Sequence, residues 1–375
     1  MSTPIPFIDL QAQRRRLGSN LTNAINAAVE GGQWILGPQV QELEKRLAEF
    51  AGVKHAIACA NGTDALMIVL RAWNVGPGDA VFVPAFTFAA SAEVVALVGA
   101  TPVFVDVLED TYNMDPASLD AAIAMVKREG KLKPRAVMPV DLFGQAADYR
   151  KLEPVIKREK LLMLCDAAQG FGGLLDGKRC GGIGDAAATS FFPAKPLGCY
   201  GDGGATFTND DGLNELLRSI QVHGQGADKY ENVRIGVNSR LDTIQAAILL
   251  EKLKVFPEEI ELRDRAAKRY SDRLRVSNRI RVPHVIEGAQ STWAQYTIQI
   301  PDRAKLQADL KAKGIPTAVY YPIPLSRQKG YAHYPTAPIP VSEKLSKVVV
   351  SLPMHADLDE ATQSRVCEAI LNSVI

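Results

Sequence analysis

The sequence predicts an α/β fold with a mostly parallel central sheet and a smaller C-terminal α+β domain. Short apolar runs bounded by turn residues recur between residues 54 and 208, and such unalternated runs are typical of strands covered on both faces. Stretches with apolar residues at helical spacing lie between several of these runs. In addition, 375 residues exceed what one hydrophobic core usually organises. A large domain with a smaller one attached therefore accounts for the length and the pattern.

The elements are expected in the order of alternating strands and helices. A helix comes first at residues 40–50, where Val40, Leu43 and Leu47 mark one apolar face. Two more helices are expected at 63–73 and 91–100. The expected strands are the apolar runs at 55–60, 80–86, 101–107, 135–140, 160–165, 187–192 and 204–208. Strands that alternate with helices indicate a mostly parallel sheet.

The domain boundary is expected in the long helical stretch at residues 239–274. This stretch predicts one or two helices, with a break at Pro257 because proline removes a helical hydrogen bond. We therefore divide the chain into a large domain with an N-terminal arm, residues 1–256, and a small domain, residues 257–375. The small domain contains the apolar runs at 294–300, 315–324 and 348–354.

Composition excludes several classes of function. Apolar residues make up 47% and charged residues 23% of the chain, as in a folded globular protein. A net charge of +1 argues against a nucleic-acid partner held by a broad basic face. No segment approaches the roughly 20 apolar residues that cross a bilayer, so we expect no membrane partner. The first residues do not resemble a signal peptide.

The five cysteines predict neither disulfides nor a metal site. They lie far apart in the sequence and show no metal-site spacing. We expect reduced thiols in a cytoplasmic protein and no metal ion.

A first candidate site is the segment that follows the strand expected at 55–60. Backbone N–H groups near Gly62, Thr63 and Asp64 open a helix, and a helix N-terminus of this kind binds a phosphate group. The alternative is that Asn61 or Thr63 only caps the helix.

A second candidate is Asp166, directly after the apolar run Leu161–Cys165 at the carboxyl end of an expected central strand. Ligands of open α/β sheets bind at that edge. A carboxylate buried there needs a cation or a protonated base as its partner. The alternative is that Asp166 caps the next helix.

The strongest single candidate is Lys195, which lies in a proline- and glycine-rich loop between two expected strands. Glycines at 198, 201, 203 and 204 let the backbone turn tightly around a ligand. Partial burial there lowers the pKa of a lysine and favours Schiff-base chemistry. The alternative is an ordinary surface lysine.

A dinucleotide fingerprint is rejected on its context. Residues 182–187 match G-x-G-x-x-A, but a true fingerprint follows a strand and opens a helix. Here the segment follows a polar stretch and precedes an apolar run, so we interpret it as a glycine turn.

The candidate segments together resemble one family. ILGPQV, NGTDAL, PAFTFAASAE, DAAQGFG, SFFPAKPLGCYGDGGA, GVNSRLDTIQAAILL, YPIPL and SLPMHADL occur in the order found in the DegT/DnrJ/EryC1/StrS family of pyridoxal-phosphate (PLP) aminotransferases acting on nucleotide-linked sugars. The resemblance covers nearly the whole chain. It implies the PLP-dependent transferase fold type I, also called aspartate-aminotransferase-like.

The resemblance implies roles for the residues around the ring of the cofactor. Lys195 forms the Schiff base, and Asp166 keeps the pyridine nitrogen protonated. Gln169 hydrogen-bonds the phenolic oxygen, and Phe88 stacks on the ring. For Phe88 the alternative is a buried core side chain.

The resemblance also implies how the phosphate is held. Thr63, Ser190 and the backbone from Gly62 to Asp64 bind it, joined by Asn238 from a second subunit. The active site is then shared between the two chains of a homodimer.

The reaction implied is amino transfer from glutamate to a nucleotide-linked keto sugar, with Lys195 carrying the proton. The stretch 238–250 resembles enzymes that aminate C3, in particular of UDP-linked 2-acetamido-3-keto-glucuronic acid, which implies a role in lipopolysaccharide or O-antigen biosynthesis. Arg240 either pairs with the sugar carboxylate or fixes the dimer interface. Tyr320 departs from the histidine of many relatives, and Tyr321 matches them; either tyrosine contacts the substrate or packs in the small domain.

Three alternatives stay open at this point. One is a C3 or C4 aminotransferase for a neutral or deoxy sugar carried by dTDP, UDP or GDP. A second is an NAD-dependent nucleotide-sugar dehydrogenase or epimerase. A third is a protein of the same fold that binds a ligand without turnover, as a sensor.

Overall fold

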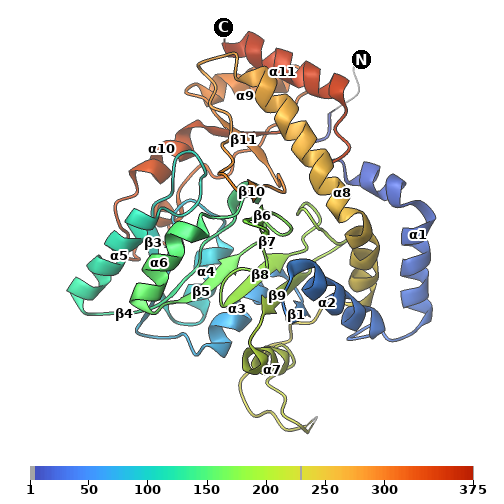
Figure 1. Cartoon of the computed structure of the whole chain (residues 1–375), viewed down its shortest axis with the longest axis vertical. Coiled ribbons are helices and arrows are strands. Elements are labelled where there is room, and N and C mark those ends of the chain that lie inside the picture. Colours follow the sequence, from blue (N-terminus) through green and yellow to red (C-terminus); the bar gives the residue numbers. More distant parts are fainter. Residues whose placement is uncertain (1–4, 229, 375) are drawn as a thin grey trace.

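A seven-stranded sheet forms the centre of the computed structural model, which describes residues 5–228 and 230–374 (Figure 1). The order of the strands is β1-β9-β8-β5-β4-β2-β3. Strand β9 is antiparallel to both of its neighbours, and all other pairs are parallel. The bounds are β1 (His55–Cys59), β2 (Asp79–Pro84), β3 (Thr101–Val105), β4 (Lys133–Val137), β5 (Leu162–Asp166), β8 (Ala186–Ser190) and β9 (Gly204–Thr208). The predicted mostly parallel sheet is confirmed, with one strand from each of the seven apolar runs.

The strands are apolar on both faces because helices cover both faces of the sheet. Along β1, Ala56 and Ala58 belong to one buried cluster, while Ile57 and Cys59 belong to another. The covering helices are α2 (Pro38–Ala51), α3 (Gly62–Ala72), α4 (Ala90–Leu97), α5 (Pro116–Glu129), α6 (Tyr149–Glu159) and α7 (Asp211–Ile220). The three predicted helices correspond to α2, α3 and α4. A short 3-10 turn, η1 (Leu142–Gly144), precedes α6.

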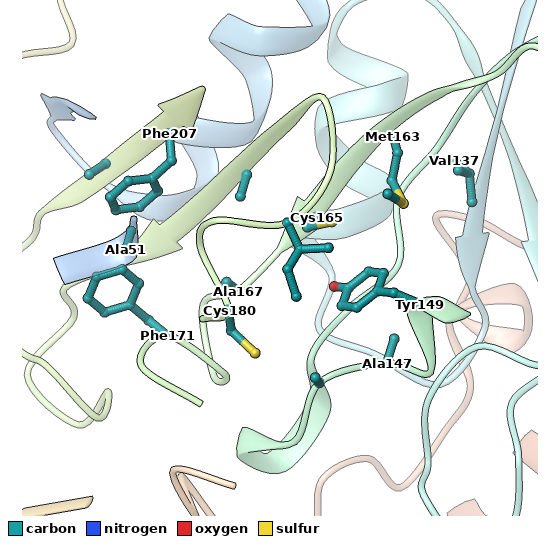
Figure 2. Close-up of a cluster of buried hydrophobic side chains, with 14 of the residues drawn as sticks. Ala51, Val137, Ala147, Tyr149, Met163, Cys165, Ala167, Phe171, Cys180 and Phe207 are labelled. Carbon is teal, nitrogen blue, oxygen red and sulfur yellow. The ribbon is translucent and has the colours of Figure 1, made fainter. Parts of the chain in front are cut away.

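One of the two clusters packs beneath the strands that end at the candidate site. Figure 2 shows Phe171, which follows β5, beside Phe207 of β9. The two rings are stacked, with centroids 5.3 Å apart. The hydroxyl of Tyr149 points into the same cluster and donates to Asp141 at 2.7 Å. The segment after β5 is therefore held in place by packing against this buried cluster.

The long helix α8 (Thr243–Leu274) connects the two parts of the chain, and it packs against α1 (Leu10–Glu30) and α2 (Figure 1). Its first half contributes Leu249 and Phe256 to the core of the large sheet, and its second half contributes Tyr270 to a separate C-terminal core. The expected break at Pro257 is wrong, because the helix continues through it. Packing along both halves outweighs the local cost of the proline. The boundary between residues 256 and 257 stays a prediction.

The C-terminal part is a small α+β unit. It contains β11 (Tyr296–Gln299), α9 (Arg303–Ala312), η2 (Leu325–Arg327), α10 (Pro340–Val348), β12 (Val349–Leu352) and α11 (Glu360–Val374). The apolar run at 315–324 forms no strand and makes only a bridge between Ala318 and Ser351. A further small sheet, which the sequence did not indicate, joins β6 (Leu174–Leu175), β7 (Lys178–Arg179) and β10 (Ala289–Gln290).

Two further observations bear on the expectations from composition. All five cysteines are buried and carry free thiols. Within residues 5–228 and 230–374, no helix combines the length and the apolar character that crossing a membrane requires.

Candidate active site

The candidate residues lie along one edge of the large sheet, where several strands end together. Cys59 pairs with Gly204, and Gly204 pairs with Ser190, so the end of β1, the start of β9 and the end of β8 are level. Asp166 ends the neighbouring strand β5 beside Ala188. The loop 191–203 connects β8 with β9 and carries Lys195. This is the carboxyl edge at which open α/β sheets bind ligands.

Asp166 and Lys195 form a pair of opposite charges at this edge. Asp166 is 5% exposed and accepts hydrogen bonds from the Ser91 hydroxyl at 2.9 Å and from the Ala168 N–H at 3.1 Å. Burial raises the pKa of Asp166, while the Ala168 and Ser91 hydrogen bonds and the nearby Lys195 oppose the rise. Burial likewise lowers the pKa of Lys195, and Asp166 opposes that fall. The two groups are thus close enough to influence each other.

The alternatives for these two residues can now be decided. Residues 168–172 form turns, so no helix begins after Asp166 and the helix-cap interpretation is wrong. Lys195 is partly buried, which also excludes an ordinary surface lysine.

Gln169 is held at both ends of its amide. Its Oε1 accepts the N–H of Phe143 at 2.8 Å, and its Nε2 donates to the hydroxyl of Tyr321 at 3.1 Å. Since the oxygen is fixed by a backbone donor, the NH₂ group faces Tyr321 and has a second hydrogen to offer. Burial raises the pKa of Tyr321. Gln169 therefore joins the C-terminal part to the sheet edge.

Phe88 stands at the same place but outside the core. It is 55% exposed, and its ring centroid lies 6.4 Å from that of Tyr321. The alternative of a buried core side chain is wrong for Phe88. An exposed aromatic ring next to Tyr321, at the edge that carries Asp166 and Lys195, is a surface on which a flat ring can stack. Tyr320 is partly buried, and its ring lies 5.8 Å from that of Tyr321.

The start of α3 is both a capped helix and a possible anion site. Asn61 accepts the N–H of Asp64 at 2.8 Å, so the cap expected as an alternative exists. In the described part of the chain, no acceptor is recorded for the N–H groups of Gly62 and Thr63. A Cβ at Gly62 would lie 2.6 Å from the Cβ of Ser190, so only glycine brings the helix this close to β8. The geometry leaves two backbone donors beside the Ser190 side chain.

The segment before α8 holds Asn238 and Arg240 in different environments. Asn238 is exposed, while the next residue, Ser239, is buried and its hydroxyl accepts the N–H of Ala60 at 3.3 Å. Arg240 is partly exposed, yet its Nε is buried and has no partner among the described residues. The structure thus brings Asp166, Gln169, Lys195, Phe88 and Tyr321 together, but it leaves Asn238 at the surface of a single chain.

Comparison with known proteins decides the family. The sequence model of the DegT/DnrJ/EryC1/StrS aminotransferase family matches residues 15–371. This chain belongs to that family.

Individual relatives agree with this membership. The chain is 49% identical over 368 residues to a UDP-2-acetamido-2-deoxy-3-oxo-D-glucuronate aminotransferase of Pseudomonas aeruginosa, and the match covers 98% of this chain and 100% of the relative. Among solved structures, a DegT DnrJ EryC1 StrS aminotransferase from Brucella abortus has 54% identity and a TM-score of 0.96, covering 98% of this chain and 99% of the other. The structure of ntda from Bacillus subtilis with bound cofactor PMP has 29% identity and a TM-score of 0.88, covering 100% and 86%.

The family, the fold, the enzyme class and the cofactor expected from the sequence are confirmed: this DegT-family protein is a PLP-dependent aminotransferase. The dehydrogenase alternative is wrong, since Gly182 and Gly184 lie in turns that lead into β8 and not into a helix.

The residues at the sheet edge fit this cofactor on their own geometry. A buried carboxylate suits a protonated ring nitrogen, a partly buried lysine suits a Schiff base, and two backbone N–H groups beside a serine suit a phosphate. Each of these groups lacks a full set of partners in the chain or has its pKa shifted by burial.

Sequence reasoning missed Ser91, which donates directly to Asp166. Its signal was present in the resembling motif PAFTFAASAE, three residues after Phe88. It also missed the N–H of Phe143, a backbone donor that no residue type announces.

Proposed function

We propose that this DegT-family aminotransferase moves an amino group from glutamate to C3 of a nucleotide-linked keto sugar, and that the sugar is UDP-linked 2-acetamido-3-keto-glucuronic acid. The observation that carries the proposal is the buried Asp166 paired with the partly buried Lys195 at the carboxyl edge of the sheet. The choice of sugar rests on similarity along the whole chain to the Pseudomonas aeruginosa aminotransferase that carries this substrate in its name.

The ring side of the site is proposed to act through four side chains. Bound PLP supplies an electron-accepting ring. Asp166 keeps the ring nitrogen protonated, and the Ser91 hydroxyl and the Ala168 N–H orient its carboxylate. Gln169 offers its second NH₂ hydrogen to the phenolic oxygen, and Phe88 covers the ring face.

Lys195 is proposed as the group that moves the proton. Lys195 would hold the cofactor through its amine, and the same amine, when free, would accept and return the proton at the reacting carbon. Burial lowers the pKa of Lys195, so a larger fraction of the amine is neutral and able to accept a proton near neutral pH.

The phosphate side is proposed to use the start of α3. The N–H of Asp64 is already bonded to Asn61, so the N–H groups of Gly62 and Thr63 are the available backbone donors. The hydroxyls of Thr63 and Ser190 complete the set, and the helix dipole adds attraction for the anion.

The second chain is proposed to complete this side with Asn238, in a homodimer with shared sites. Support comes from large apolar side chains exposed near Asn238: Ile235 is 80% exposed and Val233 is 50% exposed. Trp34 is 57% exposed, and its backbone carbonyl accepts the N–H of Thr243 at the start of α8. Large exposed apolar side chains of this kind are typical of association surfaces.

The sugar is proposed to lie between Arg240 and the two tyrosines, Tyr320 and Tyr321. Among residues 5–228 and 230–374, the buried Nε of Arg240 is a donor without an acceptor, and a sugar carboxylate would supply one. We further propose a cytoplasmic enzyme, for which the five free thiols are the support, and a role in O-antigen or other lipopolysaccharide synthesis.

The two half-reactions test the function directly. Glutamate added to the PLP-loaded enzyme should change the absorbance of the bound cofactor, and the UDP-linked 3-keto uronate should reverse that change with formation of the 3-amino sugar. Lys195→Ala is the control and should carry out neither half. No response to glutamate would favour the ligand-binding sensor, while a response to glutamate with reversal only by a neutral keto sugar would reject the uronate.

A further inference from the structure

Helix α8 holds the loop that carries Lys195 through hydrogen bonds between its side chains and the loop backbone. Three side chains of α8 reach the backbone of this loop. Gln245 accepts the N–H of Tyr200 at 2.9 Å, Lys252 donates to the carbonyl of Gly198 at 2.6 Å, and Arg263 donates to the carbonyl of Pro196 at 3.4 Å. These contacts begin at the residue directly after Lys195.

The three side chains lie on one face of the helix. Gln245, Lys252 and Glu259 are spaced by seven residues, which is nearly two helical turns, and Arg263 follows one turn later. Successive positions along α8 contact the loop at residues 200, 198 and 196, so the loop runs antiparallel to the helix. A single rigid element therefore sets the position of the backbone on one side of Lys195.

Two of these side chains carry charges whose burial costs free energy, and a buried glutamate of the same helix offsets part of that cost. Lys252 is 1% exposed and Arg263 is 8% exposed. Burial lowers the pKa of both groups, and Glu259 opposes the fall in each case. Glu259 is itself buried and accepts both hydrogen bonds of the Gln13 amide and an ion pair from Arg16, two residues of α1.

Buried charges of this kind contribute little net stability, because desolvation offsets much of their attraction. An apolar side chain of similar volume would fill the same space. What the charged groups add is geometry, because each of them holds one carbonyl of the loop in place. The ammonium group of Lys252 also lies 4.3 Å from the ring centroid of Tyr200, which fixes a second point of the loop.

We propose that Gln245, Lys252 and Arg263 are positioning residues that hold the 196–200 backbone so that Lys195 stays aligned with the reacting carbon. The proposal rests on the proposed role of Lys195. None of the three residues contacts the candidate site in the contacts recorded for residues 5–228 and 230–374. Their effect on the reaction passes through the loop.

We call Gln245, Lys252 and Arg263, with the loop backbone they bind, the clamp. Lys252→Met tests the clamp, because methionine keeps most of the length and volume but cannot donate a hydrogen bond to the Gly198 carbonyl. The matched control is Lys254→Met, which removes a lysine from the exposed face of the same helix, where the side chain is 66% exposed. Hydrogen exchange on the PLP-loaded enzyme should show amides of residues 192–203 exchanging about tenfold faster in Lys252→Met, with β5 and β8 unchanged. Lys254→Met should match the parent throughout.

Kinetics supply the second readout. Misplacing Lys195 should lower kcat by about 10- to 100-fold, while KM for glutamate and for the keto sugar changes less than about twofold. If Lys252→Met does not fold, Gln245→Met removes the Tyr200 contact without touching a buried charge and should give the same pattern more weakly.

Two results would overturn the clamp: unchanged exchange in residues 192–203, or faster exchange in β5 and β8 to the same extent as in the loop. The proposed function fails by a separate result, namely the absence of cofactor on Lys195 in the parent enzyme. Exchange in the loop reports on the clamp in either case.

Discussion

The two sides of the candidate site differ in how completely one chain builds them. On the ring side, Asp166 and Gln169 accept hydrogen bonds from Ser91 and Phe143, and the loop that carries Lys195 is bonded to α8 through Lys252. On the other side, Asn238 is exposed and the Nε of Arg240 has no partner in the described chain. The first side is preorganised in the monomer, whereas the second has the character of an incomplete surface.

This difference separates two kinds of function. Chemistry at the ring depends on a fixed carboxylate and a fixed amine, which a folded chain provides by itself. In the proposed function, recognition of the phosphate and the sugar depends on Asn238 and Arg240, which a second chain or a substrate would complete. Variants on the first side should therefore affect turnover, and variants on the second side should affect assembly and selectivity.

The largest effect is expected for Asp166→Asn, on the preorganised side. The substitution keeps the shape and the Ser91 contact but removes the charge that we propose keeps the ring nitrogen protonated. The enzyme should still bind PLP and stay coloured, while kcat falls by about two orders of magnitude or more. Turnover within a fewfold of the parent would show that the carboxylate only shapes the turn at residues 168–172.

Subunit mixing tests the incomplete side. Lys195→Ala and Asn238→Ala should each be poorly active alone. If sites are shared, a mixed dimer contains one site with neither lesion, so equal mixing with free exchange should restore about a quarter of the parent activity.

The reference for this experiment is the sum of the two unmixed samples, and native mass spectrometry verifies that mixed dimers have formed. Activity that stays at that sum despite mixed dimers would place Asn238 in the site of its own chain.

A smaller effect is expected for Arg240→Met. If Arg240 faces the sugar carboxylate, the enzyme should lose about tenfold in its preference for the uronate over a matched keto sugar without the carboxylate, which corresponds to about 1.4 kcal/mol. The measurement is kcat/KM for both sugars in parent and variant. An equal loss for both sugars would make Arg240 a residue of the dimer interface, and a parent that prefers the neutral sugar would reject the uronate.

The last effect concerns the support of the ring side, and it changes the pH dependence of stability, with no direct effect on substrate selectivity. Burial lowers the pKa of Lys252 to about 8 in the folded chain, whereas an unfolded lysine titrates near 10.4. Between these values the unfolded chain binds more protons, so the contribution of Lys252 to stability is complete above about pH 10.4 and is lost as pH falls through about 8.

Urea unfolding should therefore show a pH-dependent difference between parent and Lys252→Met. The stability of the parent relative to the variant should rise by up to about 3 kcal/mol between pH 7 and 10. Lys254→Met should show no such change relative to the parent. A difference between parent and Lys252→Met that stays constant with pH would mean that Lys252 is solvated in the folded enzyme.

Sequence reasoning reached the ring side more fully than the rest. Strands buried on both faces leave unbroken apolar runs, and Asp166 and Lys195 directly follow or connect such runs, so their place at one edge follows from strand topology. Pro257 misled because the packing of α8 on two cores outweighs a local propensity.

The burial of the charged side chains Lys252, Glu259 and Arg263 on α8 was not predicted, for a related reason. Lysine, glutamate and arginine in a long helix are normally exposed, so residue type alone does not indicate that Lys252, Glu259 and Arg263 are buried. Their register held a signal, since Lys252 lies between Leu249 and Phe256 on the apolar stripe of the helix. Which loop these side chains hold depends on tertiary contacts that spacing alone does not give.

The most direct test of the account is to locate the covalent bond to the cofactor. The PLP-loaded enzyme is reduced with borohydride, digested, and its peptides are mapped by mass spectrometry. The account predicts a single pyridoxyl label on Lys195, within the peptide that spans the 191–203 loop, and no label there in Lys195→Ala. A label on any other lysine of the parent enzyme would contradict it.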